Sequence, residues 1–276
     1  MILHRIADWD DAYANAANIA GGDRWPALWQ EPAAAFRGGM TAAGRASLDL
    51  AYGPKPRNRL DLFVPEGSPK GLVVYIHGGF WRAFDKSVWS HLAKGPLAHG
   101  YAVAMPAYTL CPEVRVGEIV REIAQAVGHA AGLVEGPILL TGHSAGGHLA
   151  TRMVTADSPL PPAVLARVRL TVSISGVHDL RPLMRTAINN DLRLDQSEAV
   201  AESPALLAPA DNARLVAWVG GAERSEFIRQ SALLANVWTG FGIETGLCVE
   251  PDRHHFTIVD GLADPDHALT RTLLTG

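Results

Sequence analysis

The stretch that decides the fold is "ILLTGHSAGGHLA", residues 138–150, near the middle of the 276-residue chain. Its first part is apolar and predicts a buried strand, and "GGHLATRMVTA" at its end predicts a helix. Between them lies Gly142-His143-Ser144-Ala145-Gly146, which matches the pattern G-x-S-x-G. The pattern by itself also occurs by chance. Its place between a strand and a helix is what a reactive serine on a sharp turn requires.

The two glycines of this motif have a steric role. On so tight a turn neighbouring backbone comes close to Gly142 and Gly146, so a Cβ atom at either position would clash. Ser144 is then expected to raise its hydroxyl above the sheet edge, at a helix N-terminus that stabilises an anion. The alternative is that Ser144 is an ordinary helix N-cap. The strand and the helix on either side favour a nucleophile.

A second stretch, "YIHGGFWRAF" at residues 75–84, follows another apolar run and bares the backbone at two glycines. A serine that attacks a carbonyl creates an oxyanion, which waiting backbone N–H groups must stabilise. We therefore predict an oxyanion hole formed by the N–H groups of Gly79, Phe80 and Ala145. His77 is expected to brace this loop instead of taking part in the chemistry.

Two side chains beside these motifs are candidates for the wall of a substrate pocket, namely Trp81 and His143. A packing role is the commoner one for a tryptophan such as Trp81.

A serine nucleophile also needs a base, and eleven histidines are candidates for that role. His254 and His255 lie in a polar loop after the last predicted strand, where a base is expected, and both remain candidates on position alone.

The acid that orients the base is expected just past the predicted strand "ARLVAWVGG". Glu223 is the first carboxylate there. Asp252, near the two histidines, and Asp179, in "SGVHDLRPL", remain alternatives. Because glutamate can replace aspartate in such triads, the extra methylene does not exclude Glu223.

Strands and helices alternate along the chain, which predicts an α/β fold with a mostly parallel sheet covered on both faces. The predicted strands are "RLDLFVP", "LVVYIHGG", "YAVAMPAY", "PILLTG", "VRLTVSISG", "ARLVAWVGG" and "ETGLCVEP". Residues 1–46 are expected to form short helices, and residues 177–209 to form a helical cap over the carboxyl edge of the sheet. No linker divides the chain, so residues 1–276 are expected to form one domain.

The composition excludes several classes of function. The net charge of −4 leaves no basic excess for nucleic acid, and no basic run is present for a membrane surface. Two cysteines and no signal peptide favour a cytoplasmic protein. No metal-ligand pattern, P-loop or dinucleotide fingerprint occurs, so neither a metal nor a cofactor is expected. The predicted partner is a small molecule, and a homodimer is compatible with the sequence.

The motifs "HGGFW" and "GHSAGGHL" resemble those of the α/β-hydrolases, and among them the arylformamidase (kynurenine formamidase) family and its bacterial esterase relatives. The resemblance runs from about Tyr52 to Leu262 and includes "YTLCPE", "SEFIRQS" and "HHFTIV". It implies that His255 is the base. The family more often has aspartate at the position of Glu223, and the resemblance implies that Glu226 caps the helix that follows.

The resemblance also implies an activity. We expect a serine hydrolase that cleaves a small ester or an N-formyl amide through an acyl-enzyme. One alternative is a carboxylesterase or thioesterase of broad range without formamidase activity. Another is a hydrolase fold that only binds a ligand, but such proteins usually lack the serine, the histidine or an oxyanion glycine, and all are present here.

Overall fold

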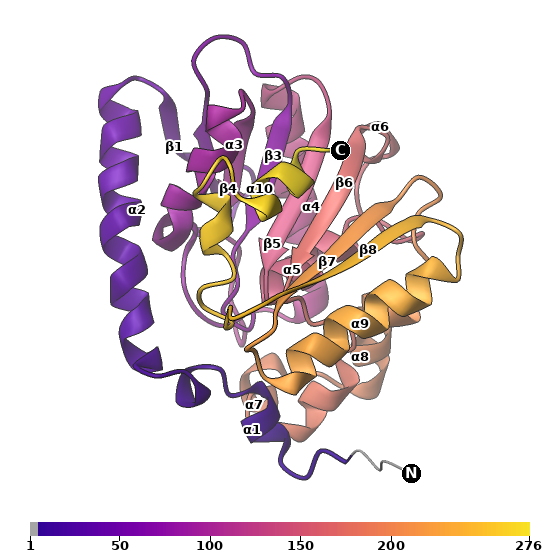
Figure 1. Ribbon diagram of the computed structural model, residues 1–276. Coiled ribbons are helices and arrows are strands. Elements are labelled where there is room, and N and C mark those ends of the chain that lie inside the picture. The colour runs from indigo at the N-terminus through magenta and orange to yellow at the C-terminus, as the bar shows by residue number, and fades with distance from the viewer. Residues whose placement is uncertain (1–4) are drawn as a thin grey trace.

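The computed structural model of the chain describes residues 5–276, so the first four residues of the predicted N-terminal segment lie outside it. Eight strands form one sheet in the order β1-β2-β4-β3-β5-β6-β7-β8 (Figure 1). The strands are β1 (Ala46–Ala51), β2 (Arg59–Phe63), β3 (Leu72–Ile76), β4 (Ala102–Pro106), β5 (Ile138–His143), β6 (Val168–Ile174), β7 (Arg214–Gly220) and β8 (Glu244–Glu250).

The sheet is parallel from β4 through β3, β5, β6 and β7 to β8, and antiparallel only where β1 and β2 join it. This confirms the predicted mostly parallel sheet. The central strands β3, β4 and β5 are buried at every residue, which explains why they are apolar without alternation. The sequence did not predict β1, because this edge strand is only half-buried and carries Asp49 in its middle.

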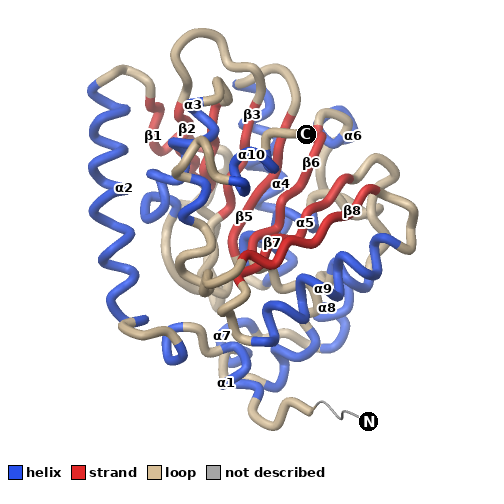
Figure 2. Tube along the Cα trace, viewed as in Figure 1, coloured by secondary structure: helices blue, strands red, loops and turns tan. Residues whose placement is uncertain are grey.

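Helices cover both faces of the sheet (Figures 1 and 2). The α-helices are α1 (Trp9–Tyr13), α2 (Trp25–Ala42), α3 (Lys94–Ala98), α4 (Val116–Leu133), α5 (Ala145–Arg152), α6 (Pro162–Leu165), α7 (Asn189–Leu192), α8 (Gln196–Ala201), α9 (Ser225–Thr239) and α10 (Ala268–Leu273). The 3₁₀ helices are η1 (Ala16–Asn18), η2 (Gly22–Arg24), η3 (Lys86–Ala93), η4 (Arg181–Arg185), η5 (Pro204–Leu206) and η6 (Asp260–Leu262).

Alternate residues of β3 belong to two separate hydrophobic cores, one on each face of the sheet. Leu72, Val74 and Ile76 pack with apolar residues of α4, α5 and α9. Val73 and Tyr75 pack on the other face with apolar residues of α2, η3, α3 and α10. This three-layer arrangement holds the carboxyl ends of the parallel strands rigid, and ligands usually bind at that edge of an open α/β sheet.

The N-terminal segment differs from its prediction in one respect. Short helices were expected, but α2 is a single helix of 18 residues. It buries Trp29, Ala33 and Met40, whose spacing places them on one face against the sheet. Pro26 at its start is compatible with a first helical turn. Residues 177–209, predicted as a cap, form η4, α7, α8 and η5, and α1 lies beside η4.

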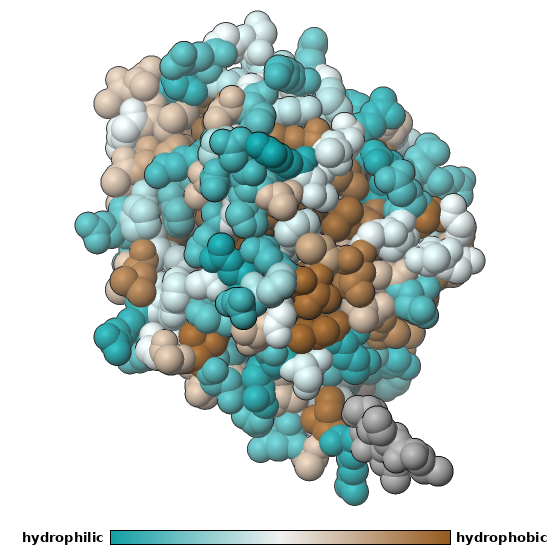
Figure 3. All heavy atoms as spheres, viewed as in Figure 1, coloured by the Kyte–Doolittle hydropathy of each residue, from teal (hydrophilic) through white to brown (hydrophobic). Residues whose placement is uncertain are grey.

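The face turned to the viewer in Figure 3 is polar around its rim, with apolar side chains gathered toward the middle. The edge strand β8 leaves Leu247 and Val249 exposed. Within residues 5–276, no helix combines the length and the hydropathy that crossing a membrane requires.

Candidate active site

Ser144 lies at the turn between β5 and α5, with φ 55° and ψ −118°. This backbone conformation is costly for a residue with a side chain and persists only where the surroundings enforce it. A Cβ atom at Gly146 would lie 1.9 Å from the carbonyl oxygen of Ile76, and one at Gly142 would lie 2.3 Å from that of Gly146. The glycines of the motif are therefore required because β3, β5 and α5 meet here in close backbone contact.

The loop after β3 lies directly against this turn. A Cβ atom at Gly78 would lie 3.1 Å from the Cβ of Ser144 and 2.8 Å from the carbonyl oxygen of His143. Gly79 and Phe80 follow with φ of 112° and 48° and line the same cavity as Ser144. Ala145 begins α5, so its N–H belongs to the helix end that has no acceptor within the helix.

His255 and Glu223 form a close pair. Nδ1 of His255 lies 2.6 Å from Oε2 of Glu223, and both side chains are almost wholly buried. The other carboxylate oxygen accepts a hydrogen bond of 2.5 Å from the hydroxyl of Ser175 and one of 2.8 Å from the N–H of Gly220. These bonds compensate the buried carboxylate and hold the His255 ring through Nδ1, which leaves Nε2 available for proton transfer.

His255 shares one cavity with Ser144, and no hydrogen bond joins the two residues among the described part of the chain. Hydrogen bonds of this kind often tighten only when a substrate is bound. His254 faces elsewhere: its Nδ1 accepts the N–H of Phe256 at 3.2 Å, and its ring packs edge-on against Trp25.

The alternative acids have other surroundings. The carboxylate of Asp179 is held by Arg181 at 2.9 Å. Asp252 is exposed on a turn with φ 59°. Of the three carboxylates considered from the sequence, Glu223 is the one that contacts His255.

The cavity has a volume of about 490 Å³. Charged residues of its wall include Asp10, Asp23 and Arg82. Six aromatic rings also line it: Tyr13, Trp29, Phe80, Phe84, Trp89 and Phe256. His143 also lines it, with its ring centroid 4.4 Å from that of His255. Burial, followed by the neighbouring His255, lowers the pKa of His143 well below its usual value, so this ring is neutral at pH 7.

Trp81 does not belong to this wall, which corrects its prediction as a pocket residue. Its side chain is fully buried, and its indole N–H points to Nδ1 of His148 at 3.3 Å. His77 packs its ring on Tyr108 with centroids 4.3 Å apart, and the Tyr108 hydroxyl donates to the His77 carbonyl at 3.0 Å. Burial lowers the pKa of His77 to about 4, so it is neutral when it holds this loop.

Sequence reasoning missed the part that the N-terminal segment takes in the site. Tyr13 lines the cavity and donates its hydroxyl to Oε1 of Glu226 at 2.8 Å. Glu226 was expected to cap α9; it lies in the first turn of α9 but binds Tyr13, Gln230 and Arg229 through its side chain. The contact joins residues 213 positions apart, so no local pattern could have revealed it.

Ser175, which holds Glu223, was missed for a similar reason. It follows β6 with φ 50° and belongs to no recognisable motif. Among residues 5–276, no three His, Cys, Asp or Glu side chains are grouped in a way that could hold a metal ion.

Known proteins of similar sequence are hydrolases. The BD-FAE family model matches residues 60–210. Kynurenine formamidase of Salmo salar is 30% identical over 243 residues, which cover 82% of this chain and 80% of the relative. Kynurenine formamidase of Danio rerio is 27% identical over 241 residues with the same coverage of both chains.

A solved structure gives a closer match. A protein of Silicibacter sp. TM1040 named "putative thioesterase" is 47% identical, with a TM-score of 0.92 over 98% of this chain and 99% of the other. The TM-score shows that the two chains share the same overall fold. The chain therefore belongs to the BD-FAE family and is an α/β-hydrolase of the arylformamidase and esterase type.

Proposed function

We propose that the protein is a serine hydrolase that acts through an acyl-enzyme, with Ser144 as nucleophile, His255 as base and Glu223 as the orienting acid. The observation that carries this proposal is the contact of 2.6 Å between His255 Nδ1 and Glu223 Oε2, beside a cavity that Ser144 also lines. A neutral imidazole bound through Nδ1 to a buried carboxylate is the arrangement that activates a serine hydroxyl.

In the proposed first step, the Ser144 oxygen attacks the substrate carbonyl carbon while Nε2 of His255 takes the hydroxyl proton. The N–H groups of Gly79, Phe80 and Ala145 stabilise the oxyanion, and Glu223 stabilises the imidazolium. When the tetrahedral intermediate collapses, the bond to the leaving group breaks and His255 gives that group its proton. A water molecule, deprotonated by His255, then attacks the carbonyl carbon of the acyl-enzyme. The bond from that carbon to the Ser144 oxygen breaks, His255 returns the proton to this oxygen, and the acid is released.

The proposed substrate is a small ester or an N-formyl amide with an aromatic leaving group. The aromatic wall of the 490 Å³ cavity supports an aromatic ring in the substrate. The similarity to two kynurenine formamidases supports formyl as the acyl group.

The second candidate is a carboxylesterase or thioesterase of broad range without formamidase activity. It is favoured by the 47% identity to the protein named "putative thioesterase". We also propose a cytoplasmic location, which is supported by the free thiols of Cys111 and Cys248.

Assays of the purified protein and of its Ser144→Ala variant distinguish the two candidate functions from each other and from a ligand-binding protein. We expect a kcat/KM for N-formylkynurenine at least comparable to that for 4-nitrophenyl acetate and for an acetyl thioester. A negligible value for the formamide with high values for the esters would support the second candidate. A fluorophosphonate probe should label the wild type and leave Ser144→Ala unlabelled. A folded wild type that is not labelled and hydrolyses none of the substrates would instead indicate a ligand-binding protein.

A further inference from the structure

The loop that carries the proposed oxyanion donors is held in an unfavourable backbone conformation. Between β3 and η3, three residues with side chains have positive φ: Phe80 at 48°, Trp81 at 56° and Phe84 at 74°. Bulky aromatic residues rarely adopt this conformation, so the contacts around the loop must enforce it. The position of the N–H groups of Gly79 and Phe80 therefore depends on whatever fixes the loop from outside.

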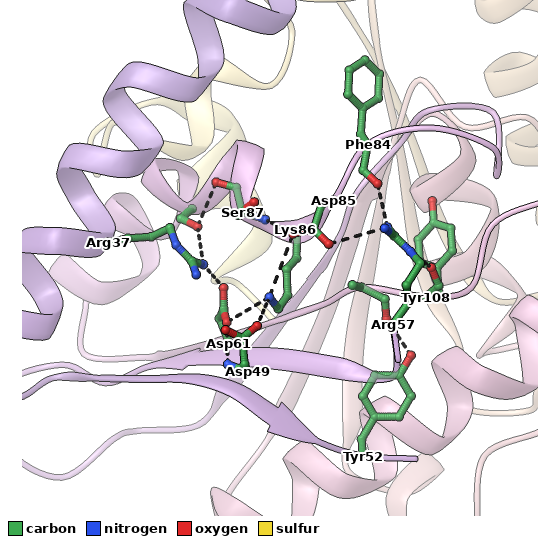
Figure 4. Close-up of polar contacts among 12 residues, drawn as sticks. Arg37, Asp49, Tyr52, Arg57, Asp61, Phe84, Asp85, Lys86, Ser87 and Tyr108 are labelled. Atoms are coloured by element: carbon green, nitrogen blue, oxygen red, sulfur yellow. Dashed lines mark hydrogen bonds and ion pairs between the residues drawn. The ribbon is translucent and has the colours of Figure 1, made fainter. Parts of the chain in front are cut away.

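Arg57 is a residue that does so, and it lies in the turn between β1 and β2 (Figure 4). Its Nη2 donates to the carbonyl oxygen of Phe84 at 2.6 Å, and its Nε donates to that of Tyr108 at 2.7 Å. Nη2 also lies 3.6 Å from the carboxylate of Asp85. The planar guanidinium thus joins the loop after β3 to the loop after β4 by charge-assisted hydrogen bonds, for which its rigid fork is suited.

The hydrogen bond from Arg57 to the Phe84 carbonyl affects the proposed oxyanion hole because Phe84 packs against Gly79. A Cβ atom at Gly79 would lie 2.8 Å from Cδ2 of Phe84 and 2.4 Å from the carbonyl oxygen of Ala83. The ring of Phe84 therefore lies directly against the backbone of Gly79. The carbonyl of Gly79 also accepts the N–H groups of Arg82 and Ala83, each at 3.0 Å, which ties Gly79 to the segment directly before Phe84.

Other contacts hold the loop at different points. The Tyr108 hydroxyl binds the carbonyl of His77 at 3.0 Å, and the N–H of Cys111 binds the carbonyl of Trp81 at 2.8 Å. These fix the beginning and the middle of the loop. Arg57 binds its end at Phe84, and through Tyr108 it also holds the residue that fixes its beginning.

We propose that Arg57 is a positioning residue for the hydrolysis: by binding the Phe84 and Tyr108 carbonyls, it sets the N–H groups of Gly79 and Phe80 where the oxyanion forms. It touches neither the substrate nor the reacting atoms. The inference rests on the proposed function, because it gives Arg57 a role in stabilising the oxyanion that Ser144 generates.

The oxyanion exists in the transition state and not in the bound substrate, so a displaced donor lowers kcat and leaves KM nearly unchanged. Misplacing a catalytic group by about 1 Å can cost on the order of 10²-fold in rate. For Arg57→Gln we expect kcat on the best ester or formamide substrate to fall by roughly 10- to 100-fold. Arg57→Lys keeps the charge but offers no planar fork, so it should recover only part of this loss.

Arg59 provides the matched control. It lies two residues further on, and within residues 5–276 its guanidinium binds only the carbonyls of its own turn, those of Gly53, Lys55 and Asn58 at 3.4, 3.3 and 2.9 Å. Arg59→Gln should therefore retain kcat within about twofold, since the bonds it loses lie away from the loop after β3. Thermal unfolding of both variants shows whether either one loses stability.

Chemical rescue of the Arg57→Ala variant distinguishes a positioning role from a merely structural one, because a merely structural role predicts no recovery of kcat when a free guanidinium compound is added. The Arg57 side chain is 29% exposed, so Arg57→Ala leaves a slot that is open to solvent. Methylguanidinium at millimolar concentration should restore part of the kcat of Arg57→Ala and leave Arg59→Ala unchanged. An inhibitor that forms an oxyanion, such as a trifluoromethyl ketone, should bind Arg57→Gln more weakly by about the factor lost in kcat/KM.

The proposal is overturned if Arg57→Gln and Arg59→Gln lose the same activity at equal folded fractions, or if the loss appears in KM alone. It is equally overturned if methylguanidinium restores nothing while Arg57→Ala is folded. Failure of the proposed function has a different signature. In that case Ser144→Ala retains the activity, whatever Arg57 does.

Discussion

At the scale of single residues, the site depends on backbone that approaches too closely for side chains. Ser144 keeps its strained backbone conformation with positive φ because Gly146 lets α5 start against β3, with the Ile76 carbonyl where a Cβ atom would stand. The strain at the serine is balanced by packing of the surrounding strands. A methyl group added at Gly146 should therefore disturb both the fold and the position of the proposed nucleophile.

Gly146→Ala is expected to destabilise the protein by on the order of 3 kcal/mol, because the added methyl meets backbone that cannot move aside. Gly128→Ala in α4 is the control, since nothing lies within 4 Å of its Cβ position. That change should stabilise the helix by about 0.5–1 kcal/mol. Urea unfolding of the two variants measures both effects, and equal stabilities would contradict the steric explanation.

The charge of Glu223 should matter more to catalysis than its shape. Glu223→Gln keeps the size of the side chain but removes the negative charge that, in the proposed mechanism, stabilises the His255 imidazolium, so kcat is expected to fall by on the order of 10³–10⁴. Asp252→Asn tests the alternative acid and should keep near wild-type kcat, because Asp252 is exposed and belongs to a turn. Steady-state kinetics of both variants decides which carboxylate serves the histidine.

At the scale of elements, a buried ionic cluster fixes α2 and η3 to the first two strands (Figure 4). The fully buried carboxylate of Asp61 on β2 pairs with Arg37 of α2 and, at 3.3 Å, with Lys86 of η3. It also accepts the N–H of Asp49 at 3.0 Å. Because α2 carries Trp29 and η3 carries Trp89, this cluster also holds two aromatic walls of the cavity.

Asp61→Asn should destabilise the protein by about 3 kcal/mol, because it leaves the buried Lys86 and the partly buried Arg37 short of negative charge. Asp49→Asn removes a carboxylate that also binds Lys86, at 2.6 Å, but is 64% exposed. Water compensates such a site, so the cost there should stay within about 1 kcal/mol. Guanidinium chloride titrations of the two variants test this difference, which would vanish if burial were unimportant.

At the scale of the whole molecule, several histidines are buried in the interior in their neutral form. Burial lowers the pKa of His77 to about 4 and those of His148 and His178 to about 3. Each is protonated in the unfolded chain below about pH 6.5. The neutral histidines are compatible with the folded state at pH 7, and stability is lost as the pH falls from 6.5 toward 3, because the unfolded chain then takes up protons that the buried rings do not.

Between pH 6 and pH 4 the unfolded chain binds more protons than the folded one at these three sites, so the free energy of unfolding decreases with falling pH. Asp260 opposes the trend, because burial raises its pKa to about 6. His77, His148, His178 and Asp260 together predict a loss of about 2–3 kcal/mol per pH unit near pH 5. The lowered pKa values of His91 and His143 act in the same direction as those of the three histidines. Urea titrations at pH 7, 6 and 5 measure the loss, and a stability independent of pH in this range would contradict the buried neutral state of the histidines.

The sequence by itself determined the alternation of strands and helices, because buried parallel strands must be apolar and the helices between them must be amphipathic. It also located Ser144 and the glycines around it, since a strained turn next to close backbone leaves few residue types to choose from. The edge strand β1 was missed because a half-buried strand need not be apolar.

Only the tertiary structure decided which distant side chains meet. It brings Glu223 to His255 and Ser175 to Glu223, and it moves Trp81 away from the cavity while placing Tyr13 and Trp29 in its wall. Such contacts join segments that lie far apart in the chain, and their partners are chosen by how whole elements pack. No local pattern of residues records that choice, whereas the conformation of a turn is dictated by its immediate neighbours.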